Sequence, residues 1–487
     1  FSYGAFGVNA LSTRLAPILS ALLGLLVTFL FVRKLFDLRT AAYAAAILAT
    51  TFGYVMVGRF AVIDMIMTFF LTVCLFSLLT AYLSRQSRYY LLAYAFMGLA
   101  FLTKGLFGIV IPGLIFLAFL TWRKDLAEMT KMRLGWGILI IAAIILPWLI
   151  AASLQKSDFL HVFFWKQQFA RFLTGSFGRK RPFWFFVPIL FGTSFPWSLF
   201  LPSAAVSGLK KDNPYRAAVQ FLLCWIAVTF VFFSIPKSKL PYYLLPISAA
   251  VATLIAGLFS AWGNRFAPSP KEQKIIGVIL KILIGIFCLA AFGGSLFFLF
   301  WKKLEESGHV QHLIQLISIV LIAGSFAVYR ATKQASYERA LIPLAVTVYG
   351  ALILTIVSMD VITPFQSTYA YAEFLKPRLR PQDRVAVFAS PDKFSDLPFH
   401  LNRRILVAGS DWGTLNDQAN LLAADERNAW FMDPGTFGHF FSNAAERIYC
   451  LLDEKKLEEL KHEAGIRELY VLKKDSRKIL VANSPEA

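Results

Sequence analysis

Residues 58–85 read GRFAVIDMIMTFFLTVCLFSLLTAYLSR, and 20 uncharged, mostly apolar residues lie between Asp64 and Arg85. A helix of about 20 such residues matches the hydrocarbon thickness of a bilayer. The pattern recurs, and we predict twelve spans, centred near Leu25, Leu48, Thr72, Phe96, Ile115, Ala143, Gly192, Ile226, Val251, Phe287, Val320 and Val348. Of the 487 residues, 57% are apolar and 16% charged, whereas about a quarter of a soluble domain is charged. The sequence therefore predicts an α-helical integral membrane protein and excludes a water-soluble globule.

The formal charge of +20 belongs to the membrane part of the chain. From Pro364 onward the chain has 17 basic and 18 acidic residues, which leaves a net +21 for the residues before it. Eighteen of those cations fall in six short connections, in every second loop between the predicted spans. The positive-inside rule makes these loops cytoplasmic and places both chain ends outside the cytoplasm. Cations dispersed beside apolar helices are typical of contacts with membrane lipids, so we expect no nucleic-acid partner.

Two domains follow from the change in composition near residue 363. Residues 1–363 form the predicted multi-span domain, and residues 364–487 form a soluble, extracytoplasmic α/β domain. In the latter, 385–389, 404–408 and 469–472 are predicted strands, and 446–464 an amphipathic helix. The four cysteines are scattered and have no metal-site spacing, so we expect neither a disulfide framework nor a cysteine metal site.

Asp64 is the most informative single residue, because an ionisable group at the end of an apolar span is costly and often functional. One interpretation is a helix N-cap, in which the carboxylate accepts backbone N–H bonds. The other is a general base or electrostatic stabiliser for glycosyl transfer, whose transition state has oxocarbenium character. The two roles are compatible.

Cations outnumber carboxylates on the predicted outer face. Arg59 precedes Asp64, Lys104 lies between two short spans, Arg171 lies in a long outer loop, and Lys237 and Lys239 lie between Pro236 and Pro241. Taken singly, such residues reach toward lipid headgroups. Together they predict a cradle for a phosphate or pyrophosphate, in which Arg supplies a bidentate fork and Lys a point charge.

The outer loop from Asp158 to Phe172 has aromatic residues at helical spacing. This pattern is typical of a helix that lies in the membrane interface, and it also suits a lid over a lipid-linked substrate. Within the loop, His161 is isolated, and the sequence provides no cluster of metal ligands.

A family resemblance rests on segments that run in order across most of the membrane region. The chain resembles the polyprenyl-phosphate-dependent membrane glycosyltransferases of the C-type fold. The branch is that of the aminoarabinose transferases of lipid A modification and, more distantly, the protein O-mannosyltransferases. The segments are GRFAVID at 58–64, GLAFLTKG at 98–105, LPW at 146–148, DFLHVFFW at 158–165, RF at 171–172, PFWFFVP at 182–188, FPW at 195–197 and FSIPKSKLPYY at 233–243.

The resemblance implies a multi-pass enzyme of the bacterial inner membrane with a periplasmic C-terminal domain. Its donor would be a sugar on undecaprenyl phosphate, and its acceptor a lipid A-like lipid, a glycan or a protein. Asp64 matches the second acidic residue of the family site. Lys104, Arg171 and Tyr243 match carrier-phosphate or sugar contacts, and Lys237 and Lys239 belong to the same loop motif. We expect a monomer.

Two departures from the family pattern are visible. The family has 13 spans, and the first span and first outer loop, which carry an earlier catalytic Asp, have no counterpart here; Phe1 to Asn9 resembles the end of that loop. In addition, Gln168 replaces a family His that can help to hold a divalent metal. We therefore assign no metal or other cofactor from the sequence, and the sequence does not identify the sugar.

The sequence thus predicts an inverting glycosyltransferase with Asp64 as its catalytic carboxylate and the outer cations as its phosphate site. A transporter or flippase for a lipid-linked sugar is the first alternative, although that class is expected to have charged residues at mid-span and related halves. A non-catalytic envelope-assembly scaffold is the second.

Overall fold

The computed structural model describes residues 2–155, 159–161, 163–165, 181–260, 268–300, 308–333, 337–389, 391–420, 422–475 and 477–485. The chain divides into two compact units, residues 1–355 and 356–487. This boundary falls within helix α16 (Tyr337–Gln366), eight residues before the division predicted from composition. Each unit is described separately.

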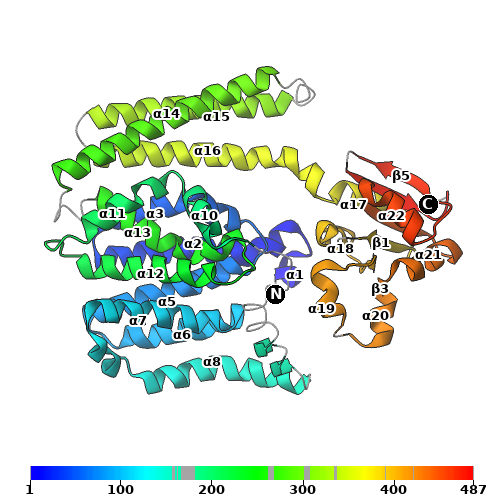
Figure 1. Cartoon of the computed structure of the whole chain (residues 1–487), viewed down its shortest axis with the longest axis horizontal. Coiled ribbons are helices and arrows are strands. Elements are labelled where there is room, and N and C mark those ends of the chain that lie inside the picture. The colour runs from blue at the N-terminus through cyan, green and yellow to red at the C-terminus, as the bar shows by residue number, and fades with distance from the viewer. Residues whose placement is uncertain are drawn as a thin grey trace. The chain divides into compact units, whose positions relative to one another are not determined.

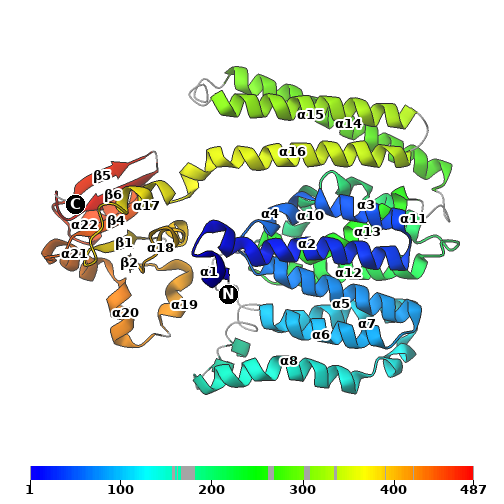
Figure 2. The same ribbon diagram turned by 180° about the vertical axis from the view of Figure 1, so that it is seen from behind.

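The first unit is a helical bundle (Figures 1 and 2). Its helices are α1 (Ser2–Phe6), α2 (Ala10–Leu35), α3 (Leu38–Ala49), α4 (Phe52–Gly58), α5 (Asp64–Ser84), α6 (Arg88–Lys104), α7 (Phe107–Arg123), α8 (Leu134–Gln155), α10 (Phe186–Thr193), α11 (Leu201–Gly208), α12 (Arg216–Ser234), α13 (Ser248–Phe259), α14 (Pro270–Phe300), α15 (Gly308–Lys333) and α16. Short 3₁₀ turns include η1 (Leu126–Lys131), η3 (Phe183–Phe185), η4 (Trp197–Phe200) and η5 (Pro241–Ile247).

All twelve predicted span centres lie on helices, and the chain is a multi-span membrane protein. Eight described helical segments are long and apolar enough to cross a membrane, or up to ten if each of two bent pairs counts as one span. The remaining two predicted spans are α6 and α7, which have 17 residues each. Such a length is at the lower limit for crossing a bilayer.

The bent pairs have local causes. Between α3 and α4 the axis turns by 65°, where the Thr50 and Thr51 hydroxyls donate to the carbonyls of Ala46 and Ile47 at 2.7 and 2.8 Å. Such bonds to the preceding turn compete with the helical ladder and bend helices. The second pair turns by 105° around Pro196, which has no N–H to continue the ladder.

The predicted basic loops meet at one end of the bundle, called here the basic end. Lys34, at the end of α2, contacts Tyr89 at the start of α6, and Arg39 pairs with Glu338 at the start of α16. Lys210 pairs with Glu272 of α14 at 2.5 Å. The α5–α6 turn belongs to the same end, since Arg85 pairs with Glu128 of η1. Because α5 has 21 residues, its first residue, Asp64, lies about 30 Å from this end.

The second unit contains a six-stranded sheet with strand order β3-β2-β1-β4-β6-β5. The strands are β1 (Arg384–Phe388), β2 (Leu406–Ala408), β3 (Phe431–Met432), β4 (Ile448–Asp453), β5 (Tyr470–Lys474) and β6 (Lys478–Ala482). The first four run parallel, and β6 is antiparallel to both β4 and β5. The helices and turns are α17 (Tyr369–Leu375), η7 (Pro391–Phe394), α18 (Leu397–Leu401), η8 (Gly413–Leu415), α19 (Asn416–Ala419), α20 (Ala424–Trp430), α21 (Pro434–Asn443), η9 (Glu454–Lys456) and α22 (Leu457–Glu463).

One expectation for this unit is wrong. The helix predicted over 446–464 is strand β4 followed by the short helix α22. Alternate residues of β4 pack on opposite faces of the sheet, Ile448 and Cys450 on one and Tyr449 and Leu451 on the other. A strand that is buried on both faces has a continuous apolar run, which lacks the alternation by which exposed strands are recognised.

Candidate active site

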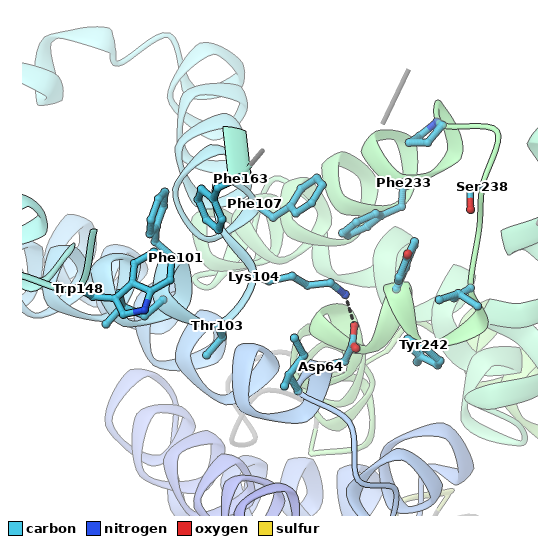
Figure 3. Close-up of a pocket in the computed structure, with 16 residues that line it drawn as sticks. Asp64, Phe101, Thr103, Lys104, Phe107, Trp148, Phe163, Phe233, Ser238 and Tyr242 are labelled. Atoms are coloured by element: carbon cyan, nitrogen blue, oxygen red, sulfur yellow. Dashed lines mark hydrogen bonds and ion pairs between the residues drawn. The ribbon is translucent and has the colours of Figure 1, made fainter. Parts of the chain in front are cut away.

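A cavity of about 470 Å³ lies at the end of the bundle opposite the basic end (Figure 3). It is bounded by the start of α5, the α6–α7 connection, α8, and the segment from Phe233 to Tyr243. Its lining residues are Ile63, Asp64, Phe101, Leu102, Thr103, Lys104, Gly105, Phe107, Trp148, Phe163, Phe233, Pro236, Ser238, Leu240, Tyr242 and Tyr243.

Asp64 and Lys104 form an ion pair in the cavity wall, with Lys104 Nζ donating to Asp64 Oδ1. The side chains are 11% and 19% exposed, so the pair is largely removed from solvent. Both residues line the cavity. The pair therefore supplies one acidic and one basic group to the same space.

The position of Lys104 follows from a tight helical hairpin. Lys104 is the last residue of α6, and Gly105 caps the helix with φ +71°, a conformation that favours glycine. Gly108 then allows close approach of α7, since a Cβ there would lie 2.4 Å from the Phe101 nitrogen. The two-residue connection of Gly105 and Leu106 thus fixes the last turn of α6, and with it Lys104, against the start of α5.

Asp64 is the first residue of α5, and Ile63 occupies the N-cap position without a side-chain cap bond. Among the described residues, the hydrogen bond of the Asp64 carboxylate goes to Lys104 rather than to a backbone N–H. The N-cap interpretation is therefore wrong in its geometry. A carboxylate in the first turn is still favoured by the positive end of the helix dipole.

Aromatic rings form two walls of the cavity. The Lys104 ammonium lies 4.5 Å from the ring centroid of Tyr243, which lies 5.3 Å from the Phe233 ring. On the other side, the Phe163 ring lies 6.0 Å from that of Phe101 and 5.4 Å from that of Trp148. This cation–π contact holds the Lys104 ammonium against the Tyr243 ring.

The remaining predicted cations are placed differently. Lys239 is buried, and its ammonium donates to the carbonyl of Pro236 and, at 3.3 Å, to that of Arg181. Burial lowers its pKa. Lys237 is exposed, and its backbone carbonyl accepts a bond from the Arg181 N–H at 3.0 Å. Arg59 is the C-cap residue that follows α4. None of these three lines the cavity, so of the predicted cations in the described chain the cavity holds Lys104.

Part of the predicted site lies outside the described residues. The residues outside are Asp158, Gln168 and Arg171 among others. The structure therefore places neither Arg171, the predicted cation of the outer loop, nor Gln168, which occupies the position of the family His. The described residues of this loop include Phe159 and Phe163, whose rings stack at 5.6 Å, which fits the predicted helical spacing. No group of three or more metal-ligating side chains occurs in the described part of the chain.

Of the aromatic residues in the cavity walls, the sequence predicts Tyr243 as a substrate contact and places Phe163 in a loop that suits a lid, and it gives the other rings no role. The segments that carry the family resemblance include four of the wall residues, Phe101, Trp148, Phe163 and Phe233. Aromatic residues are abundant here, with 48 Phe in the chain, and composition does not separate a cavity wall from the membrane-facing surface. Only the fold brings these rings around one polar pair.

Comparisons with known proteins give a consistent result. The family profile of dolichyl-phosphate-mannose-protein mannosyltransferase matches residues 1–150, which include Asp64 and Lys104. An undecaprenyl phosphate-α-4-amino-4-deoxy-L-arabinose arabinosyl transferase from Shewanella sediminis is 26% identical over 92% of this chain and 81% of its own. A relative of the same name from Pseudomonas fluorescens is 31% identical over 59% of this chain. That match spans about half of the relative, 49% of its length.

The fold also matches a solved structure, ArnT from Cupriavidus metallidurans bound to undecaprenyl phosphate. The TM-score is 0.81 at 22% identity, over 99% of this chain and 86% of the other. These findings confirm the resemblance drawn from the sequence motifs and the class of fold.

Proposed function

We propose that this protein is a glycosyltransferase of the bacterial inner membrane that takes a sugar from undecaprenyl phosphate on the periplasmic side. The observation that carries the proposal is the largely buried Asp64–Lys104 pair in an aromatic-walled cavity, at the end of the bundle opposite the basic loops. The similarity to the arabinosyl transferases and to the fold of ArnT supports it. The acceptor we propose is a lipid A-like lipid.

The reaction would be a single displacement at the anomeric carbon. The bond from this carbon to the carrier phosphate breaks, the acceptor oxygen forms a new bond from the opposite face, and the carrier leaves as undecaprenyl phosphate. Charge develops on the departing phosphate oxygen, where the Lys104 ammonium stabilises it. Displacement from the opposite face inverts the anomeric configuration.

Asp64 has one of two roles, depending on the acceptor. A hydroxyl acceptor loses a proton, which the carboxylate takes as general base. A phosphate acceptor is already ionised, and Asp64 then orients Lys104 and stabilises positive charge on the sugar ring. Tyr243 positions the ammonium through its ring. Lys237, Arg59 and Arg171 would attract the anionic donor, and Lys239 would hold the loop that carries Lys237.

The orientation in the membrane supports a periplasmic reaction. The positive-inside rule makes the basic end cytoplasmic, so the cavity faces the opposite side. Helix α16 starts at the basic end, at the Arg39–Glu338 pair, and crosses the bilayer once before the C-terminal domain begins. We therefore propose that this domain is periplasmic.

The test is transfer in proteoliposomes by the purified full chain and its Asp64→Asn variant. The donor is undecaprenyl phosphate-4-amino-4-deoxy-L-arabinose, with a second undecaprenyl phosphate sugar in parallel, and the acceptor is lipid A. We expect product with the unchanged chain and its loss with Asp64→Asn. Asp125→Asn, a change of the same type at the basic end, serves as the control.

Normal transfer by a well-folded Asp64→Asn protein would overturn the assignment of Asp64. Movement of the donor across the bilayer without product, at a rate above that of empty liposomes, would favour the flippase instead.

A further inference from the structure

A second cavity, of about 330 Å³, lies at the basic end of the bundle, a helix length away from the candidate active site. It is formed by the α5–α6 turn and by η1 with the residues that follow it. Its lining residues are Arg85, Ser87, Tyr90, Glu128, Thr130, Lys131 and Arg133.

The cavity carries excess positive charge around one buried carboxylate. Glu128 is 1% exposed and accepts from Arg85, from Tyr90 Oη at 2.9 Å and from Lys131 Nζ at 3.2 Å. It thereby holds two cations side by side. Arg85 also lies 3.9 Å from Asp125, so the three basic residues exceed their two partner carboxylates by one positive charge. Arg133 is exposed and has no carboxylate within 4 Å in the described part of the chain. The cavity therefore attracts an anion.

An apolar groove of about 300 Å³ adjoins this charged cavity, between α6, α7 and α8. The segment 128–134 separates the two and lines both: Glu128, Lys131 and Arg133 face the charged cavity, while Met132 and Leu134 face the groove. Across the boundary, the ring of Tyr90 in the charged cavity lies 6.1 Å from that of Phe116 in the groove.

The groove is open to the outer surface of the bundle. Leu117, Leu134 and Ile138 line it and are 45%, 44% and 69% exposed. In a membrane protein such a surface meets lipid tails. Gly113 also lines the groove, and a Cβ at this position would have no atom within 4 Å, so the space beside it is open.

We propose that the charged cavity and the groove together bind one anionic phospholipid of the cytoplasmic leaflet. Its phosphate lies among Arg85, Lys131 and Arg133, and one acyl chain lies in the groove beside Gly113. Basic pockets between helices on the cytoplasmic side are suited to anionic headgroups. A free phosphate would account for the charges but not for the adjoining apolar groove, and the phospholipid accounts for both.

The headgroup is tested with the full chain in nanodiscs of phosphatidylcholine that contain a small fraction of phosphatidylglycerol. Retained phosphatidylglycerol is measured by native mass spectrometry. The variant is Lys131→Gln/Arg133→Gln, and the control is Lys124→Gln/Lys211→Gln, which removes two cations from the same end. Lys124 and Arg133 both have a left-handed backbone, at φ +56° and +53°. Each double variant therefore replaces one residue in this conformation by Gln, which makes the two variants comparable in backbone strain.

Each cation near an anionic lipid contributes about fivefold to binding, so we expect the pocket variant, which lacks two cations, to bind phosphatidylglycerol about 25-fold more weakly. The control should bind as the unchanged chain does. Equal loss in both double variants, or no loss in the pocket variant, would overturn the proposal. If the double variant does not fold, Arg133→Gln alone gives the same comparison, with about fivefold weakening expected, because this side chain is exposed.

The acyl groove is tested with Gly113→Leu, whose side chain enters the open space, against Gly285→Leu in α14, where a Cβ also meets nothing within 4 Å. We expect weaker retention for Gly113→Leu only. A parallel arm adds inorganic phosphate to pure phosphatidylcholine nanodiscs and follows thermal unfolding. Stabilisation by phosphate equal to that by phosphatidylglycerol, with retention unaffected by Gly113→Leu, would identify a free-anion site and refute the lipid site.

Discussion

The coupling between Asp64 and Lys104 is measurable in a double-mutant cycle. The proteins are the unchanged chain, Asp64→Asn, Lys104→Met and the double variant; methionine keeps much of the lysine stem without its charge. Removing one partner of a sealed ion pair costs ~3–5 kcal/mol, whereas exposed pairs contribute ~0–1 kcal/mol. These side chains are 11% and 19% exposed and border a cavity of about 470 Å³. Water there can solvate a charge left alone, so we expect a coupling free energy of about 2 kcal/mol.

The assay is equilibrium unfolding of the four purified proteins in one detergent. Each single change should lower the free energy of unfolding, and the double variant should be less destabilised than the sum of the two. A coupling of zero, with both single variants as stable as the unchanged chain, would mean that the ion pair contributes nothing in the folded protein. The account of how Lys104 is positioned would then be wrong.

The same four proteins separate stability from catalysis. Loss of a group that stabilises developing charge typically lowers kcat by about 10²–10³-fold, and we expect this for Lys104→Met. Because the two residues act as a unit, the kcat of the double variant should lie within about tenfold of the kcat of the slower single variant. Arg59→Gln removes a cation that does not line the cavity and should change kcat by less than about tenfold. Effects of equal size for Arg59 and Lys104 would contradict the geometry.

Two further predictions concern orientation and the C-terminal domain. On a background without native cysteines, Ser238→Cys should react with a membrane-impermeant maleimide in spheroplasts and Lys211→Cys should not; the reverse pattern would invert the topology. Asp433 caps α21, where its carboxylate accepts from the Thr436 hydroxyl and from the Thr436 N–H at 3.0 Å, and these bonds lower its pKa. Asp433→Ala should therefore cost about 1 kcal/mol near neutral pH, measured by unfolding of this domain in the full chain. Because the folded-state pKa lies below the unfolded one, this difference should shrink as the pH falls through it; a constant difference down to pH 2 would refute the cap.

The sequence predicts the membrane class and the main polar pair for clear physical reasons. A run of 20 residues without charge has few alternatives to a span, so the span containing Thr72 was identifiable from composition alone. Asp64 and Lys104 were recognisable because a charge at the end of such a run is costly. Their mutual contact was not predicted, since it depends on how the α6–α7 hairpin packs against the start of α5.

Other features depend on tertiary contacts and could not be derived from local pattern. Strand β4 was taken for part of a helix because its apolar run has no alternation once both faces are buried. The aromatic walls lie on four separate segments. The chain has 76 aromatic side chains, of which 48 are Phe, 17 Tyr and 11 Trp, so composition alone identifies none of the wall residues. Lys239 was assigned to phosphate because its charge was visible, whereas its carbonyl partners at Pro236 and Arg181 belong to backbone.

The positions of the cations explain why one charge type has three different consequences in this chain. At the basic end, Lys210 pairs with Glu272 and Arg39 with Glu338, each across two segments of the bundle. The summed positive charge of the loops at this end sets the orientation of the chain in the membrane. At the opposite end, the Lys239 ammonium donates to the backbone carbonyls of Pro236 and Arg181 and thereby stabilises a loop. Lys104 alone among the described cations there combines a carboxylate partner, an aromatic face and a cavity. The proposed phosphate site is therefore set by a cation that lines a cavity, and the count of basic residues on a face is a poor guide to where that site lies.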